Sequence, residues 1–159
     1  MITEQDIHYL ERAVSLAEKG LAEGNDPFGS VLVSADGTIL AEDYNRVSSG
    51  DVTKHPEIEL VRFASVHLNQ EERHQSTVYT SGEHCPMCAT AHAMAGMGRI
   101  VYATSSSQLR EWKREFGSTS TVVHPLPIHK VIVDAWVDGP VDTFFNQVKA
   151  LHNRRHKSK

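Results

Sequence analysis

The two cysteines of this 159-residue chain lie three positions apart, where a strand-like run gives way to a helix-like run. The strand-like run is 76–81, and the helix-like run extends from Cys85 to Met97 and contains Cys88. The positive end of a helix dipole favours thiolates at such a position. Two thiols at this spacing form either part of a metal site or a redox pair.

A second predicted helix start carries residues of matching chemistry. His55-Pro56-Glu57 opens a helix that continues to Leu68, and proline is well placed at a first helical position because its missing amide needs no partner there. Helices that follow strands of one sheet tend to begin at the same edge, so we expect His55 near the cysteines. One His and two Cys supply three ligands to a tetrahedral zinc and leave the fourth position for water, as in catalytic sites. Glu57 is then placed for general acid/base work.

Each of these residues also has a plainer interpretation. A histidine before a helix is commonly a polar starting residue, and a glutamate in the first turn commonly interacts with the helix dipole. A C-x-x-C pair alone is shared by zinc sites, thiol–disulfide oxidoreductases and unrelated sequences. The oxidoreductase interpretation leaves His55 and Glu57 without a purpose, so the combination favours zinc. A zinc-stabilised binding module without catalysis is the other alternative.

The remaining chain alternates between helices and strands. Apolar spacing predicts a helix over 3–23, which Thr3 and Asp6 begin with a capping box. Strands at 28–34 and 38–44 form a hairpin around an Asp-Gly turn. The other expected elements are strands at 99–103 and 130–134, helices at 105–116 and 140–153, a charged connection at 70–75 and an irregular loop at 117–127. This order predicts an α/β fold, a three-layer α-β-α sandwich with a five-stranded mixed sheet, in a single domain over residues 1–159.

Composition and charge limit the expected partners and compartment. The net charge of -4 argues against a broad nucleic-acid-binding surface, and no apolar run approaches the roughly 20 residues of a membrane span. The basic tail, 154–159, is expected to be a solvated, frayed terminus. The N-terminus is polar and acidic, unlike a secretory signal, and two cysteines are too few for a disulfide scaffold. We therefore expect a cytoplasmic protein.

These residues together resemble the cytidine deaminase-like superfamily. H-x-E followed by C-x-x-C is the pattern of the zinc nucleobase deaminases. The resemblance runs from about Ile7 to Tyr102, and its landmarks in chain order are Pro27-Phe28-Gly29, Asn45, His55-Pro56-Glu57, Glu83-His84-Cys85-Pro86-Met87-Cys88 and Gly98-Arg99-Ile100-Val101-Tyr102. The chain resembles in particular the small bacterial nucleoside and nucleobase deaminases, which include guanine deaminase and the tRNA adenosine deaminases.

The resemblance implies a site and an activity. Zinc would be held by His55, Cys85 and Cys88, and Glu57 would shuttle protons while water displaces ammonia from an amino-bearing ring carbon. Asn45 would hydrogen-bond the substrate and Phe28 would lie near its base; the plainer interpretations are a turn residue and a core residue.

The same resemblance implies the kind of substrate and the assembly. The substrate would be a small-molecule nucleobase or nucleoside, with a guanine-like purine favoured over a cytosine-type pyrimidine. Relatives of this size are commonly homodimers, so a homodimer is expected.

Several positions depart from the pattern of these relatives. His84 stands where they have proline, and its ring either contacts the substrate or has no role there. Met94 replaces an aromatic residue that can wall a purine pocket. His92 is interpreted as a packed core or interface histidine, and Trp112 either stacks on a base or belongs to an ordinary amphipathic helix. The Gly/Ala-rich stretch of tRNA-editing relatives is absent from 105–116. Together with the acidic charge, this makes nucleic acid an unfavoured partner, although an RNA substrate would use the basic tail to hold phosphates.

Overall fold

The computed structural model describes residues 1–118 and 121–159, so part of the loop predicted at 117–127 lies outside the described residues. Five strands form one mixed sheet in the order β2-β1-β3-β4-β5. The strands are β1 (Gly29–Val33), β2 (Ile39–Tyr44), β3 (Thr77–Gly82), β4 (Arg99–Thr104) and β5 (Val137–Asp138). β1 pairs antiparallel with both β2 and β3, whereas β3, β4 and β5 run parallel. The predicted five-stranded mixed sheet is therefore confirmed.

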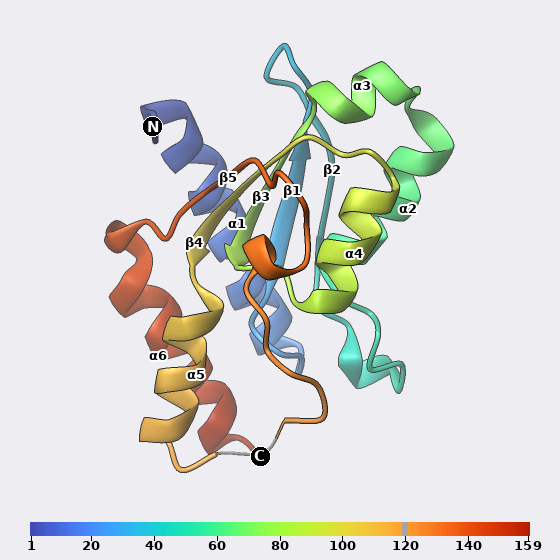
Figure 1. The fold of residues 1–159 in the computed structure, drawn as a ribbon. Helices are drawn as coiled ribbons and strands as arrows, with labels where there is room; N and C mark the ends of the chain where they lie inside the picture. Colours follow the sequence, from blue (N-terminus) through green and yellow to red (C-terminus); the bar gives the residue numbers. More distant parts are fainter. Residues whose placement is uncertain (119–120) are drawn as a thin grey trace.

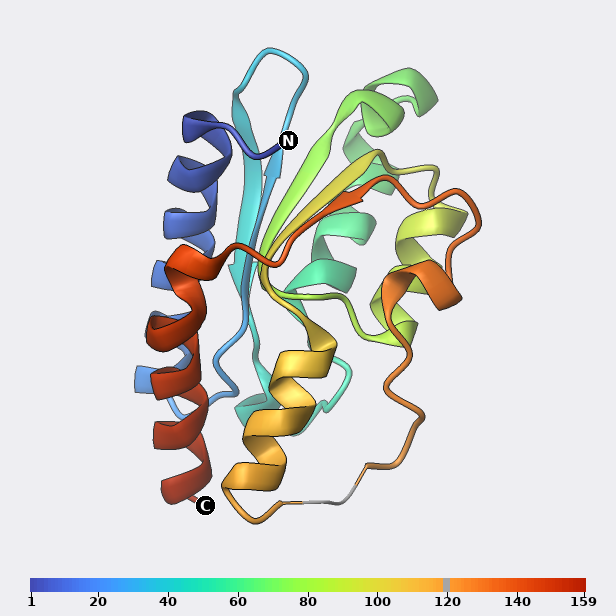
Figure 2. The ribbon, with the colours of Figure 1, turned by 60° about the vertical axis from the view of Figure 1, so that its left-hand side comes forward.

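Helices cover both faces of this sheet (Figures 1 and 2). One face carries α1 (Glu4–Ala22), α5 (Ser106–Glu115) and α6 (Phe145–Lys157), and the other carries α2 (Pro56–His67) and α4 (Pro86–Met94). The short helix α3 (Gln70–Gln75) connects α2 to β3. Within the described ranges, no helix combines the length and the apolar character that crossing a membrane requires. The expected α-β-α layering is confirmed.

Alternate residues of the central strands pack on opposite layers, as the two-residue period of a strand buried on both faces requires. The core beneath α1 and α6 takes Val31, Val33, Tyr79, Val101 and Ala103 from the strands. The opposite core takes Leu32, Val78 and Ile100. The predicted start of the first helix is confirmed, because Thr3 and Asp6 form the expected reciprocal capping box.

The fifth strand was predicted at 130–134, and this prediction was wrong. Ile128–Lys130 form a 3₁₀ turn, and the side chain of Val133 is 87% exposed. The paired segment is instead the two-residue strand Val137–Asp138, which lies beside Ile100 and Val101 of β4. The run of apolar β-branched residues at 131–133 resembles a buried strand. The actual strand is only two residues long, which is too short to show the alternation of apolar and polar residues by which a strand is predicted.

Two other predicted segments differ from the structure. The charged connection at 70–75 is helix α3, because Asn69 and Glu72 cap it reciprocally. The basic tail is not frayed: α6 begins at Phe145 and continues to Lys157, and Arg155 donates to the Asp26 carboxylate at 2.8 Å. The tail is therefore part of the layer beside α1.

Gly29 marks a close approach of α1 to the sheet. A Cβ atom here would lie 2.6 Å from the Ala17 backbone nitrogen and would also collide with the Ala13 carbonyl oxygen. Both atoms belong to backbone, so only a shift of the helix would relieve the clash. We expect Gly29→Ala to lower the free energy of unfolding by about 3 kcal/mol, in the range of overpacked cores. Urea unfolding measures this, and an unchanged midpoint would contradict the packing described.

Candidate active site

The predicted meeting of two helix starts is present in the structure. His55 and Cys85 are the N-cap residues of α2 and α4, and a proline follows each. The Nδ1 atom of His55 lies 3.6 Å from the Cys85 sulfur and 3.7 Å from the Cys88 sulfur. All three ligand atoms lie within 4.8 Å of one another. Chain segments 30 residues apart thus bring one imidazole and two thiols together.

This donor set fits a zinc ion. Zinc binds sulfur at about 2.3 Å and imidazole nitrogen at about 2.0–2.1 Å, so a tetrahedral angle places sulfur and nitrogen about 3.6 Å apart. The two separations observed around His55 are 3.6 and 3.7 Å. Two sulfurs and one nitrogen are also the atom types that select zinc over magnesium or calcium.

The electrostatics of the two cysteines favour a cation between them. The hydrogen bond with Cys88 lowers the pKa of the Cys85 thiol to about 4 against the effect of burial, with a further contribution from His55. The same pairing and burial raise the pKa of Cys88. The hydrogen bond with Cys85 in turn raises the pKa of His55. One thiolate and one thiol therefore face the imidazole, and a divalent metal would replace the remaining proton.

Glu57 lies beside the ligand atoms. Its carboxylate is 5% exposed, and its Oε2 atom accepts from the Cys88 sulfur at 3.7 Å. Its Oε1 atom accepts from the Thr80 hydroxyl at 2.9 Å and from the Ser30 hydroxyl at 3.2 Å. Burial raises the pKa of Glu57 above its usual range, which moves the carboxyl toward the pH at which a proton carrier works.

Sequence reasoning missed the two hydroxyls that hold Glu57. Ser30 and Thr80 are directly opposite each other in the pairing of β1 with β3, and both are fully buried. Their hydroxyls also hydrogen-bond each other at 2.9 Å. The available signal was a polar residue inside each of two strands that are buried almost throughout, because a buried polar side chain needs a partner.

Glu83 was a landmark of the sequence without an assigned role. Its two carboxylate oxygens accept from the backbone amides of Ser106 and Ile128, each at 2.8 Å. It therefore ties the start of α5 and the 3₁₀ turn at 128–130 to the turn that carries the cysteines.

Asn45 and Phe28 lie next to each other at the end of the β1–β2 pair. Asn45 is 1% exposed, and its amide oxygen accepts from the backbone amides of Asp26 and Val47. These contacts of the oxygen are those of a turn residue, which was the plainer interpretation of Asn45. Phe28 is half-buried, and its ring lies beside Gly82 and edge-on to His152 at 5.0 Å.

His84 is buried in the structure. It is 1% exposed, and its ring packs edge-on against His92 at 5.4 Å. Neither ring nitrogen has a hydrogen-bond partner among the described residues. Burial lowers the pKa of His84 well below its usual value, so the ring is neutral. The expectation of substrate contact therefore has no support in its position. His92 is buried, as predicted, and its Nε2 donates to the Gly98 carbonyl oxygen at 2.8 Å.

Trp112 and Met94 also lie away from the zinc ligands. Trp112 is 1% exposed and packs edge-on against Phe145 in the core beneath α6. The indole has no free face on which a base can stack, so its position follows the amphipathic-helix interpretation. The side chain of Met94 is 84% exposed at the end of α4. The positions of both side chains depend on how the helices pack, and the chemistry of the two residues does not determine that packing.

Residues 3–104 match the family model described as "Cytidine and deoxycytidylate deaminase zinc-binding region". The matched range covers the three ligand residues, Glu57, Asn45 and Phe28. The chain belongs to this deaminase family. It is therefore a hydrolytic deaminase with zinc as its cofactor, and the geometry around His55 agrees with that assignment.

Individual members of the deaminase family show how broad its activities are. The chain is 30% identical over 116 residues to the protein named "Probable cytosine deaminase" of Schizosaccharomyces pombe, covering 73% of this chain and 70% of that one. It is 39% identical over 105 residues to guanine deaminase of Bacillus subtilis, covering 65% and 67%. A solved chain from work on A-to-I editing by tRNA:A34 deaminases superposes with a TM-score of 0.59 at 30% identity, covering 83% and 98%.

Proposed function

We propose that this deaminase releases ammonia from the exocyclic amino group of a free nucleobase or nucleoside, with a guanine-like purine favoured. The observation that carries the proposal is the placement of Glu57. Its Oε2 atom lies 3.7 Å from a ligand sulfur, while Ser30 and Thr80 occupy its Oε1 atom. A buried carboxyl with one oxygen fixed and the other beside a metal site is suited to carry a proton.

Each residue of the site has a proposed role in this reaction. Zinc bound by His55, Cys85 and Cys88 would polarise a water and lower its pKa. Glu57 accepts a proton from the attacking water at Oε2 and returns it to the substrate as the amino group leaves. Asn45 donates from its amide nitrogen to the substrate, since its oxygen is already engaged by two backbone amides.

The preference for a guanine-like ring is supported by the similarity to the Bacillus subtilis guanine deaminase. A cytosine-type pyrimidine is the alternative, because the Schizosaccharomyces pombe relative is named for cytosine. An adenosine in tRNA is a further alternative. Phe28 offers an apolar wall against which any of these substrate rings can lie. An experiment is therefore needed to identify the ring that the enzyme deaminates.

An ammonia-release screen tests the proposal. The zinc-loaded protein is assayed on free bases, nucleosides and related amino-heterocycles, with Glu57→Ala as the blank. We expect guanine or a guanine-like purine to give the highest kcat/KM. A pyrimidine that exceeds every purine would favour the alternative, and ammonia release equal to the blank for every compound would overturn the proposal.

We also propose that residues 1–159 form one domain and that the protein acts as a cytoplasmic homodimer. Helices α5 and α6 lie beyond the matched region, but Trp112 and Val148 are buried in the same core as α1. Trp136 and Val133 are 62% and 87% exposed near α4, and such apolar surface is typical of an interface. Light scattering would show the mass of two chains.

A further inference from the structure

Ser30 and Thr80 face the same side of the sheet as α2. They are directly opposite each other in the pairing of β1 with β3, each two positions along its strand from Leu32 or Val78. Side chains two positions apart on a strand share a face, and Leu32 and Val78 pack with residues of α2. The two hydroxyls therefore point toward α2, where Glu57 lies in the first turn and is 5% exposed. The two-residue period of the strands thus brings both small polar side chains to one buried carboxyl.

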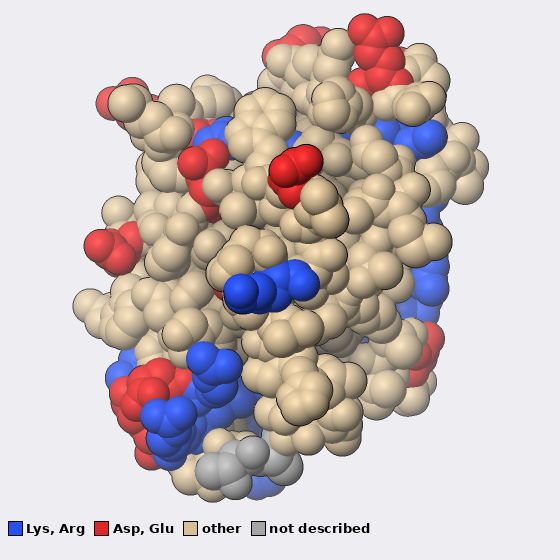
Figure 3. All heavy atoms as spheres, in the orientation of Figure 1, with Lys and Arg blue, Asp and Glu red and all other residues tan. Residues whose placement is uncertain are grey.

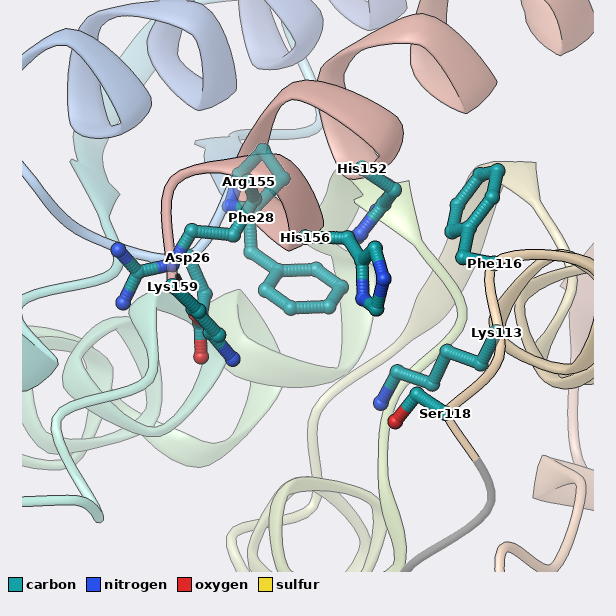
Figure 4. Close-up of a pocket in the computed structure, with 10 residues that line it drawn as sticks. Asp26, Phe28, Lys113, Phe116, Ser118, His152, Arg155, His156 and Lys159 are labelled. Carbon is teal, nitrogen blue, oxygen red and sulfur yellow. Dashed lines mark hydrogen bonds and ion pairs between the residues drawn. The ribbon is translucent and has the colours of Figure 1, made fainter.

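The carboxyl of Glu57 is held without a Lys or Arg side chain. Its oxygens accept from the two hydroxyls and from the Cys88 sulfur, and among the described residues no Lys or Arg lies within ion-pair distance of it. Figure 3 shows Lys and Arg side chains gathered instead over the lower ends of α5 and α6. Figure 4 shows Lys113 and Arg155 in a surface pocket that Glu57 does not line, and Arg155 pairs there with Asp26. Glu57 is therefore hydrogen-bonded by side chains that carry no charge of their own.

The hydroxyl of Thr80 has more acceptors around it than it has hydrogens. The Glu57 Oε1 atom lies 2.9 Å from its oxygen, the Gly82 carbonyl oxygen 3.0 Å and the Gly29 carbonyl oxygen 3.4 Å. A hydroxyl donates a single hydrogen, so it serves one of these acceptors at a time. The distances to Glu57 and to Gly82 are nearly equal. Rotation about the Cβ–Oγ1 bond therefore moves the hydrogen from one acceptor to the other.

The hydroxyl of Ser30 also has two acceptors within reach. It lies 2.9 Å from the Thr80 oxygen and 3.2 Å from the Glu57 Oε1 atom. Two arrangements of hydrogens therefore satisfy the pair. In the first, both hydroxyls donate to Oε1; in the second, Thr80 donates to the Gly82 carbonyl and Ser30 donates to Thr80. The exchange between them requires no movement of a carbon, nitrogen or oxygen atom.

The two arrangements suit the two states of a carboxyl that carries a proton in turn. A charged carboxylate forms stronger hydrogen bonds than a protonated carboxyl, so both hydroxyls donate to Glu57 while it is charged. Once Glu57 holds a proton, the Gly82 carbonyl becomes the better acceptor for Thr80. A lysine in this place would stabilise the charged form alone, and an apolar pair would favour the neutral form. Rotating hydroxyls accommodate both forms.

We infer that Ser30 and Thr80 are positioning residues of the deamination. Their hydrogens turn toward the Glu57 carboxylate before it takes a proton from water and away from it afterwards, so its Oε2 atom stays beside the Cys88 sulfur through both proton transfers. Neither hydroxyl gives up its hydrogen, because the transferred proton moves from water to Oε2 and then to the substrate. The inference rests on the proposed function, since it concerns the proton that Glu57 carries there.

Isosteric removal of a hydroxyl tests this inference. Thr80→Val keeps the shape of the side chain and leaves it no hydrogen to donate. We expect kcat to fall about tenfold or more, the worth of a hydrogen bond to a charged group, with KM within about twofold and zinc content unchanged. Thr80→Ser keeps the hydroxyl and should recover most of the loss. Ser30→Ala should lower kcat less, by about threefold, because Thr80 still reaches Oε1.

Thr104→Val is the matched control. Thr104 is 2% exposed in β4, and its hydroxyl donates to the Ser81 carbonyl oxygen at 2.8 Å, so the change removes a buried hydroxyl that has no hydrogen bond to Glu57. It should leave kcat unchanged. The solvent isotope effect on kcat should rise in Thr80→Val, where proton transfer is slowed, and not in Thr104→Val. An equal loss of kcat in Thr104→Val, or no recovery in Thr80→Ser, would overturn the inference, since packing alone would then explain the loss.

A double-mutant cycle in urea unfolding separates this inference from the proposed function. Thr80→Val and Glu57→Ala are measured singly and together in the zinc-loaded protein, where residues in contact give losses that do not add. We expect Thr80→Val to lower the unfolding midpoint more in the wild-type background than beside Glu57→Ala, and additive losses would overturn the inference. Coupling in a protein that releases no ammonia from any amino-heterocycle would reject the proposed function, and the positioning role with it. Ammonia release by the wild-type protein with kcat unchanged in Thr80→Val would overturn the inference alone.

Discussion

Replacing Glu57 by glutamine is expected to lower kcat by about a thousandfold, in the range that general acid/base groups contribute. The amide keeps the shape of the side chain and can still contact Thr80 and Ser30, whose hydroxyls hold the carboxylate in place. It has no basic oxygen to take a proton, however, so the attacking water cannot be deprotonated. Steady-state ammonia release measures the loss.

The same variant should keep its metal. Glu57 is not among the three ligand residues, so its amide is expected to leave one zinc per chain by elemental analysis. Glu59→Gln is the matched control: it removes the same charge two positions along α2, where Glu59 pairs with the exposed Arg62, and it should retain full activity. Glu57→Gln that turns over like Glu59→Gln would reject Glu57 as the proton carrier. Loss of zinc from Glu57→Gln would make it a ligand instead.

The parts of the site that the sequence predicts depend on local signals. A proline after His55 and another after Cys85 fix where two helices begin, and the crossover rule places those starts at one edge of the sheet. The distances from His55 to the two sulfurs confirm that juxtaposition. The zinc site can therefore be predicted from the chemistry of its ligands and from local backbone preferences, without knowledge of the packing elsewhere.

The parts of the site that the sequence leaves open depend on tertiary packing. The residue types of His84 and Trp112 suit a substrate pocket, but both side chains are 1% exposed. Whether an aromatic ring faces a cavity or a neighbouring helix depends on where that helix lies, and α6 begins five residues later than predicted. The hydroxyls of Ser30 and Thr80 went unnoticed for the same reason, since only strand pairing brings them to Glu57.

Removing zinc is expected to cost the protein both activity and stability. The bound ion contributes RT ln(1 + [Zn]/Kd) to the folded state, about 4 kcal/mol when free zinc is a thousand times its Kd. Without zinc, one thiol and one thiolate, from Cys88 and Cys85, remain close to each other and to His55 with no metal ion between them. We therefore expect a chelator to lower Tm by several degrees or more and to abolish ammonia release, and added zinc to restore both.

A cysteine variant separates this zinc site from a redox pair. Cys88→Ser is expected to bind zinc far more weakly, because a serine hydroxyl is a poor replacement for a thiolate ligand and only the Cys85 sulfur and the His55 nitrogen would remain as ligands. It should resemble the chelated protein in Tm and in lost activity, and added zinc should rescue it poorly. Thiol–disulfide exchange predicts the opposite pattern: no stoichiometric zinc in the wild-type protein, a reversible Cys85–Cys88 disulfide, and a Tm that a chelator leaves unchanged. Elemental analysis and thiol titration of the same sample distinguish the two, because a sulfur that ligates zinc is not free to form the disulfide.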